Sequence, residues 1–300
     1  MASTADNHYY VPHGAYWPLV GSVGLATTLG GFASYLNDNP TGLTITFAGV
    51  AILVVMMFGW FGTVVKESES GKYSSWEDKS FRLGMSWFIF SEVMFFAAFF
   101  GALFYARVYS VPWLLGEGSG ANTHNVLWST FTEVWPTNGP KDMGGSDFHM
   151  GWWPLPFINT VILLTSGVTV TIAHHAIVKN DRRRFILGLL ATVILGFVFV
   201  YLQMVEYQHA YHEGMKLNSG IYGSTFFMLT GFHGFHVSMG AIILLVVLIR
   251  AIRGHFTPKR HFAFEAAAWY WHFVDVVWLC LLYTSPSPRD LNPNLVCRRL

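Results

Sequence analysis

Residues 222–249 read YGSTFFMLTGFHGFHVSMGAIILLVVLI, a stretch without Asp, Glu, Lys, Arg or Pro. As a helix it is longer than the roughly 20 residues that cross the hydrocarbon core of a bilayer. Six further stretches of 20 or more mostly apolar residues are bounded by charged residues or by Gly, Pro and Asn. They cover residues 16–35, 43–65, 83–108, 156–178, 185–210 and 262–282. The sequence therefore predicts an all-α, polytopic membrane protein with seven transmembrane helices.

The composition agrees with a membrane protein and excludes several other classes. Of the 300 residues, 53% are hydrophobic and 12% are charged, whereas soluble domains have about 25% charged residues. The formal net charge of +1 provides no basic surface for nucleic acid. Cys280 and Cys297 do not form a C-x-x-C pair, so the sequence indicates neither a disulfide framework nor a thiolate metal site.

The basic residues predict how the chain is oriented. Twelve Lys and Arg lie in the three connections that share a side with the N-terminus, and three lie on the other side before the C-terminal segment. Cytoplasmic loops are enriched in Lys and Arg. We therefore expect the N-terminus in the cytoplasm, or in the matrix if the membrane is that of an organelle.

The connection 109–153 is long and rich in glycine. Connections of this length that lack secondary structure are uncommon, and those that do are mostly functional loops or disordered segments. We expect it to cover the outer face with little secondary structure. Its length favours a bacterial inner membrane, with the mitochondrial inner membrane as the alternative.

Glu92 is a carboxyl group inside a predicted helix. It stands in SWFIFSEVMFFAAFF. At a helical rise of about 1.5 Å per residue, it lies about 13 Å along the axis from the predicted start of the helix. A charge at such a depth costs at least about 2.5 kcal/mol, and no basic residue lies within two turns on the same helix. We expect Glu92 to be protonated or hydrogen-bonded by another helix. Two roles stay open, a neutral link between helices and a group that handles protons or lipid.

Two later helices contain residues that could bind metal. Glu206 and His209 have the E-x-x-H spacing found in di-iron helix bundles, and His233 and His236 lie one turn apart. A di-iron membrane oxidase built from these four residues is therefore one alternative function.

The predicted depths of these residues argue against a shared metal site. His174 falls near the cytoplasmic end of its helix, whereas Glu206 and His209 fall near the outer end, some 20 to 30 Å away at the helical rise. Metal–ligand bonds are about 2 Å long. We therefore expect no metal site and an interhelix polar network instead. Its expected members are Glu206, His209, His233, His236, Glu265, His272 and Asp275.

Basic residues mark the predicted cytoplasmic helix ends. Lys66 ends one helix, and Arg250 and Arg253 end another. Cations at this level can hold lipid head groups. The alternative is that they only determine topology and extend their charged ends to the interface.

Six strings resemble the subunit III family of the haem-copper cytochrome c oxidases. They are YWPLVG (16–21), SWFIFSEVMFFAAFF (86–100), NTVILLTSGVTVTIAHH (159–175), EYQHA (206–210), IYGSTFFMLTGFHGFHV (221–237) and HFAFEAAAWYWHFVDVVWL (261–279). The last two are long and distinctive.

This resemblance implies a single membrane domain, residues 1–282, in which the helices of 16–65 are separated by a lipid-filled cleft from those of 83–282. It implies a non-catalytic core subunit of an aa3-type cytochrome c oxidase that stabilises subunit I, binds phospholipid and supports proton uptake. Subunits I and II are the expected partners and hold the haem and copper. The chain itself is expected to bind structural phospholipids, with no cofactor, no metal and no catalytic residues of its own.

The resemblance also assigns roles to single residues. Glu92 matches the buried carboxylate of the family's third helix. Residues that match positions near bound lipid are Trp60, Lys66, Glu67, Arg250 and Arg253.

The C-terminal segment departs from the family. Residues 280–300 read CLLYTSPSPRDLNPNLVCRRL, and their beginning resembles a translated sequencing-library adapter. We expect non-native sequence from about residue 280 and a polar tail over 283–300. The alternative is a genuine polar tail.

A proton-coupled transporter that uses Glu92 is the third functional hypothesis. Many transporters consist of two matching halves with interrupted helices. The absence of this pattern in the sequence weakens the transporter hypothesis.

Overall fold

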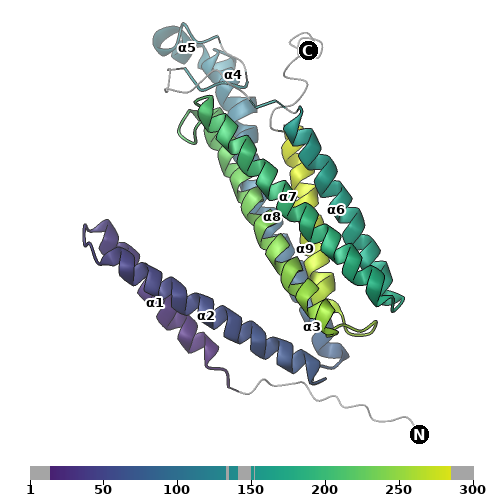
Figure 1. Cartoon of the computed structure of the whole chain (residues 1–300). Helices are drawn as coiled ribbons and strands as arrows, with labels where there is room; N and C mark the ends of the chain where they lie inside the picture. The colour runs from purple at the N-terminus through teal and green to yellow at the C-terminus, as the bar shows by residue number, and fades with distance from the viewer. Residues whose placement is uncertain (1–13, 133–134, 141–149, 152, 285–300) are drawn as a thin grey trace. The chain divides into compact units, whose positions relative to one another are not determined.

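The computed structural model describes residues 14–132, 135–140, 150–151 and 153–284. Over this part of the chain the fold is all-helical, and seven helices are long and apolar enough to cross a membrane. This confirms the predicted fold class. The seven helices are α1 (Trp17–Leu36), α2 (Gly42–Glu69), α3 (Ser75–Tyr105), α6 (Leu155–Val178), α7 (Arg182–His212), α8 (Ile221–Arg253) and α9 (Phe262–Thr284) (Figure 1). Residues 285–300, most of the expected tail, lie outside the described residues.

Several helices extend beyond the apolar stretches that predicted them. The helix α3 begins at Ser75 rather than at residue 83, and Glu77 in its first turn accepts a hydrogen bond from the Ser74 backbone N–H at 2.8 Å. Acidic residues stabilise the first turn because the helix dipole is positive there. Hydropathy detects only the part of a helix that lies in hydrocarbon, so it misses such polar ends.

The expectation of little regular structure after residue 108 is wrong for the first part of that connection. A π-helical turn η1 (Ala106–Ser110), α4 (Val111–Leu114), a 3-10 turn η2 (Gly118–Gly120) and α5 (Ala121–Leu127) follow α3 directly. Pro112 lies in the first turn of α4, directly after the π-helical turn η1. Gly116 has a φ of 94° and turns the chain between α4 and η2.

The chain divides into two compact units, Met1–Leu83 and Gly84–Leu300. In the first unit α1 and α2 pack along each other. A Cβ atom added at Gly31 would lie 2.5 Å from the backbone N of Thr46, and one added at Gly24 would lie 2.9 Å from Leu53 Cδ2. Such close approach at small residues is the usual basis of helix association in lipid.

In the second unit α6, α7, α8 and α9 form a closed bundle. The packed pairs are α6 with α7, α7 with α8, α8 with α9, and α6 with α9 (Figure 1). The last helix is the most enclosed, since 56% of its apolar window is buried compared with 33% for α7. The densest aromatic run of the sequence, WYWHF at 269–273, therefore lies inside the protein to a large extent.

Trp271 of α9 contacts each of the other three helices in this bundle. Its side chain is fully buried, and its Nε1–H donates to Ser166 Oγ of α6 at 2.8 Å. A Cβ atom added at Gly196 of α7 would lie 2.7 Å from Trp271 Cη2, and one at Gly240 of α8 would lie 2.9 Å from Cε3. Only glycine fits at these two positions beside the ring.

We predict that Gly196→Ala and Gly240→Ala each lower the free energy of unfolding by about 1–3 kcal/mol, the range for overpacking a core. The added methyl group meets a rigid indole that has no free space to move into. The measurement is denaturant-induced unfolding of the detergent-solubilised protein, followed by helical circular dichroism.

Gly234→Ala on the same helix is the matched control, because a Cβ atom there has no neighbour within 4 Å. Alanine is the better helix former by roughly 0.5–1 kcal/mol, so this variant should be neutral or stabilised. Equal destabilisation of all three variants would contradict the packing of Trp271 described above.

Candidate functional site

Glu92 of α3 and His236 of α8 form a buried polar pair. Glu92 Oε2 and His236 Nε2 are 2.8 Å apart. His236 Nδ1 lies 2.6 Å from the carbonyl oxygen of Phe232, and since a carbonyl only accepts, Nδ1 bears a hydrogen. One further hydrogen then lies between Nε2 and Oε2. The pair is electrically neutral as a whole, whether that hydrogen belongs to the carboxyl or to the imidazole.

Aromatic rings enclose this pair. The ring centroids of Phe96 and Phe95 lie 5.0 and 5.9 Å from that of His236, and Tyr270 stacks on the imidazole at 6.4 Å. The side chain of His236 is 9% exposed and that of Glu92 is 21% exposed. The imidazole is thus sealed inside the bundle, whereas one edge of the carboxyl can be reached from outside.

This finding identifies the partner of Glu92, which the sequence left open. A hydrogen bond from another helix was one of the two expected solutions, and His236 supplies it. The proton-related role assigned to Glu92 by the resemblance stays a prediction.

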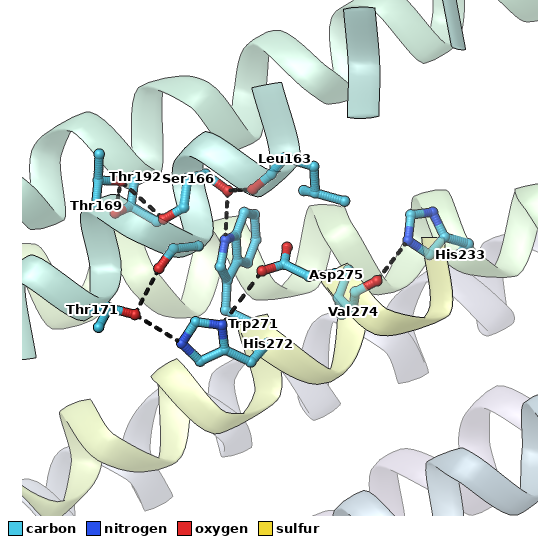
Figure 2. A network of polar contacts seen from close by, with 11 residues as sticks. Leu163, Ser166, Thr169, Thr171, Thr192, His233, Trp271, His272, Val274 and Asp275 are labelled. Atoms are coloured by element: carbon cyan, nitrogen blue, oxygen red, sulfur yellow. Dashed lines mark hydrogen bonds and ion pairs between the residues drawn. The ribbon is translucent and has the colours of Figure 1, made fainter. Parts of the chain in front are cut away.

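Polar contacts connect α9 to α6 and α8 (Figure 2). Trp271 donates to Ser166 of α6, and His233 Nε2 of α8 lies 3.2 Å from the carbonyl oxygen of Val274. One turn beyond Val274, Trp278 Nε1 donates to Thr160 Oγ1 of α6 at 2.9 Å. Each bond joins two helices where water is unavailable, which is the role expected of polar residues in membrane bundles.

His272 and Asp275 lie next to each other on α9, facing α6 (Figure 2). His272 Nδ1 is 3.5 Å from Asp275 Oδ2, and His272 Nε2 is 3.3 Å from Thr171 Oγ1 of α6. A Cβ atom at Gly167 would lie 2.6 Å from Asp275 Oδ2. The glycine therefore provides the space that the Asp275 carboxyl occupies.

Glu206 and His209 lie near the end of α7. Glu206 is 3% exposed, and its Oε2 has no hydrogen-bond partner among the described residues. Its predicted membership in the interhelix network stays a prediction, as does that of His209.

The four-residue di-iron set is not brought together. Among the described residues, three or more potential metal ligands come within 4.8 Å of one another only at His174, His261 and Glu265. The sequence indicated His174 and Glu265 as separate residues, and His261 was not among the predicted site residues. The available signal was the i, i+4 spacing of His261 and Glu265 at the start of a helix whose depth matches the end of α6.

The predicted lipid-binding residues of the first unit lie on the second half of α2. Trp60 is 47% exposed, and Lys66 is exposed in the last turn of the helix. The Glu67 carboxylate accepts a hydrogen bond from the Tyr73 hydroxyl at 2.9 Å. Glu67 therefore has a structural partner, which stabilises the connection that follows α2.

The basic residues of the second unit gather at the end of α8. The Arg250 guanidinium lies over the ring of Phe256, 4.8 Å from its centroid, and Arg253 is exposed. Arg182 at the start of α7 donates to the carbonyl oxygen of Ile252 at 2.7 Å, satisfying a terminal carbonyl of α8. Arg182 was not among the predicted site residues.

Comparisons with known proteins identify one family over most of the chain. The model of the family "Cytochrome c oxidase subunit III" matches residues 7–119 and 129–285. The chain is 42% identical over 283 residues to cytochrome c oxidase subunit 3 of Marchantia polymorpha, covering 94% of this chain and 96% of that protein. It is 40% identical over 278 residues to the subunit 3 of Gadus morhua, covering 92% of this chain and 95% of that protein.

The contact between Glu92 and His236 predicts a coupling between the two residues. Glu92→Leu and His236→Leu should each destabilise the protein by about 1–3 kcal/mol, because each leaves a buried polar group without its partner. The double variant should lose less unfolding free energy than the two single losses added together, by about 1–2 kcal/mol. Denaturant-induced unfolding of the four proteins in detergent measures this coupling, and strictly additive effects would show that the two side chains do not interact.

Proposed function

The chain belongs to the cytochrome c oxidase subunit III family, and from this premise we propose that it is a non-catalytic core subunit of an aa3-type oxidase. Family membership implies assembly with other oxidase subunits, and we propose subunits I and II as its partners. There the chain stabilises subunit I, which with subunit II holds the haem and copper. The observation that supports this most strongly is the similarity over 94% of the chain, which includes residues of all seven membrane-spanning helices.

The geometry of the second unit is consistent with a supporting role. Several of its polar groups are joined across helices, as are Glu92 with His236, Trp271 with Ser166, and Trp278 with Thr160. Such bonds fix the positions of the helices and give the bundle a defined surface. The neutral Glu92–His236 pair is the group that we propose to support proton uptake, because the carboxyl edge is reachable and the imidazole behind it can share the proton.

We propose that phospholipid phosphates bind at the basic helix ends. Lys66 of α2 supports such binding in the first unit, and Arg250 and Arg253 of α8 support it in the second. The cation–π contact with Phe256 restricts the Arg250 guanidinium before any lipid binds. The distribution of Lys and Arg supports an N-terminus in the cytoplasm of a bacterium, or in the matrix if the membrane is mitochondrial.

Removal of this chain from the purified oxidase tests the supporting role. We predict that haem and copper per subunit I stay unchanged while the complex completes fewer turnovers before it becomes inactive. Metal analysis and oxygen consumption measure the two quantities. The reconstituted complex, to which the purified chain has been added back, is the control and should recover the longer activity.

Stoichiometric iron or copper in the isolated chain would contradict the proposal and would favour a redox enzyme. Proton-coupled flux in liposomes that contain only this chain would favour the transporter instead.

The lipid proposal predicts that Arg253→Gln weakens retention of anionic phospholipid. One basic residue near a membrane surface contributes about 1 kcal/mol, so retention should fall roughly fivefold. Native mass spectrometry of the oxidase released from phosphatidylglycerol nanodiscs measures the bound lipid. Lys259→Gln is the matched control, an exposed basic residue on the following connection. Equal lipid loss in both variants would show that Arg253 contributes only general charge.

A further inference from the structure

His174, His261 and Glu265 converge where α6 ends and α9 begins. Glu265 Oε1 lies 3.1 Å from His261 Nε2 and 3.5 Å from His174 Nε2. The imidazole rings of the two histidines are 5.7 Å apart between centroids. One ligand atom from each residue lies within 4.8 Å of the other two, so two nitrogens and one carboxylate oxygen surround a common point.

The local fold explains how these residues meet. His261 directly precedes α9, and its carbonyl oxygen accepts from the Glu265 backbone N–H at 3.1 Å. Residues four apart lie on the same face of a helix, which places His261 beside Glu265. His174 comes from the last turns of α6, and α6 packs against α9. The site thus combines residues that are far apart in the sequence.

The orientation of His261 is determined by a second hydrogen bond. Its Nδ1 lies 3.1 Å from the carbonyl oxygen of Thr257, so Nδ1 bears the hydrogen and a neutral ring has its lone pair on Nε2. Thr257 is itself held by two backbone bonds with Arg260, at 3.0 and 3.1 Å. A backbone carbonyl that fixes the far nitrogen is the usual support of a metal-binding histidine.

The buried Nε2 of His261 makes no hydrogen bond within the described part of the chain. It faces a carboxylate oxygen at 3.1 Å. A nitrogen lone pair and a carboxylate oxygen at that distance repel each other unless a proton or a metal ion lies between them. This unsatisfied nitrogen is the second observation that points to a ligand.

We propose that His174, His261 and Glu265 bind a Zn²⁺ ion, with water as the fourth ligand. In a tetrahedral zinc site with bonds of about 2.0–2.1 Å, ligand atoms lie about 3.3 Å apart, close to the 3.1 and 3.5 Å between Glu265 and the two histidines. Imidazole and carboxylate are established ligands of zinc. The His174 side chain is 38% exposed, which leaves access for the ion and for water.

The bound ion connects the end of α6 to the connection between α8 and α9. This proposal departs from the expectation that the chain holds no metal, and all three proposed protein ligands belong to this chain. The depths predicted along the membrane normal placed the histidines of α6 at a different level from those of α7 and α8. The same reasoning places the end of α6 level with the start of α9.

Equilibrium dialysis of the purified oxidase complex against Zn²⁺ tests the site. The complex should bind one more ion per chain than the His261→Gln and Glu265→Gln complexes. Loss of a supporting group around a metal ligand costs 10- to 100-fold in affinity, so loss of a ligand should cost at least about 100-fold. His175→Gln is the matched control, because His175 is exposed next to His174 and does not belong to the trio. It should bind zinc as the parent does.

A second measurement needs no variant. Zn²⁺ should protect His174 of the parent complex from carbethoxylation by diethylpyrocarbonate and leave His175 reactive, as peptide mass spectrometry can show. Zinc binding that is the same in His261→Gln and Glu265→Gln as in the parent would overturn the proposal. Equal reactivity of His174 with and without zinc would overturn it as well.

Discussion

The second unit of this protein depends on the position of Trp271. The indole is fully buried, its N–H is bonded to Ser166 of α6, and its ring edge lies where Gly196 of α7 and Gly240 of α8 leave space. One side chain of α9 thereby touches the other three helices of the bundle. Lipid offers no hydrophobic driving force between helices, so packing and interhelix hydrogen bonds must hold them together. Trp271 provides both.

The remaining polar residues follow from the same constraint. Hydrocarbon cannot satisfy a carboxyl or an imidazole, and the bundle therefore supplies partners from neighbouring helices. Glu92 finds His236, and His272 finds Thr171 and Asp275. The pair of Glu92 and His236 keeps one proton between two helices without adding net charge. A supporting subunit needs such internal order, because its partners recognise a surface that must keep its shape.

The number of helices and their apolar cores followed from the sequence, because twenty or more apolar residues have few alternatives in a chain of this composition. The helix ends did not, since Ser75 and Glu69 lie in polar segments that hydropathy ignores. The sequence also raised Glu92 and His236 as isolated candidates. Their contact depends on the rotation of α3 and α8 about their axes, and this rotation is set by packing rather than by any local pattern.

His261 was missed for a related reason. Judged alone, a histidine just before a helix is an ordinary end residue, and its importance appears only when the end of α6 is placed beside it. Depth reasoning could have found this neighbourhood, because α6 and α9 meet at the same level of the membrane. Which individual side chains face each other at that level could be determined only from the structure.

The most direct test of the role of Trp271 compares the stability of Trp271→Ala with that of Trp269→Ala. Trp269 is a half-buried tryptophan of the same helix that packs edge-on against Phe262, with 6.3 Å between the ring centroids. Denaturant-induced unfolding of the purified protein should show a loss of about 3–5 kcal/mol for Trp271→Ala, as for other buried aromatic residues, and a clearly smaller loss for Trp269→Ala. Equal losses for the two variants would contradict the claim that Trp271 holds the bundle together.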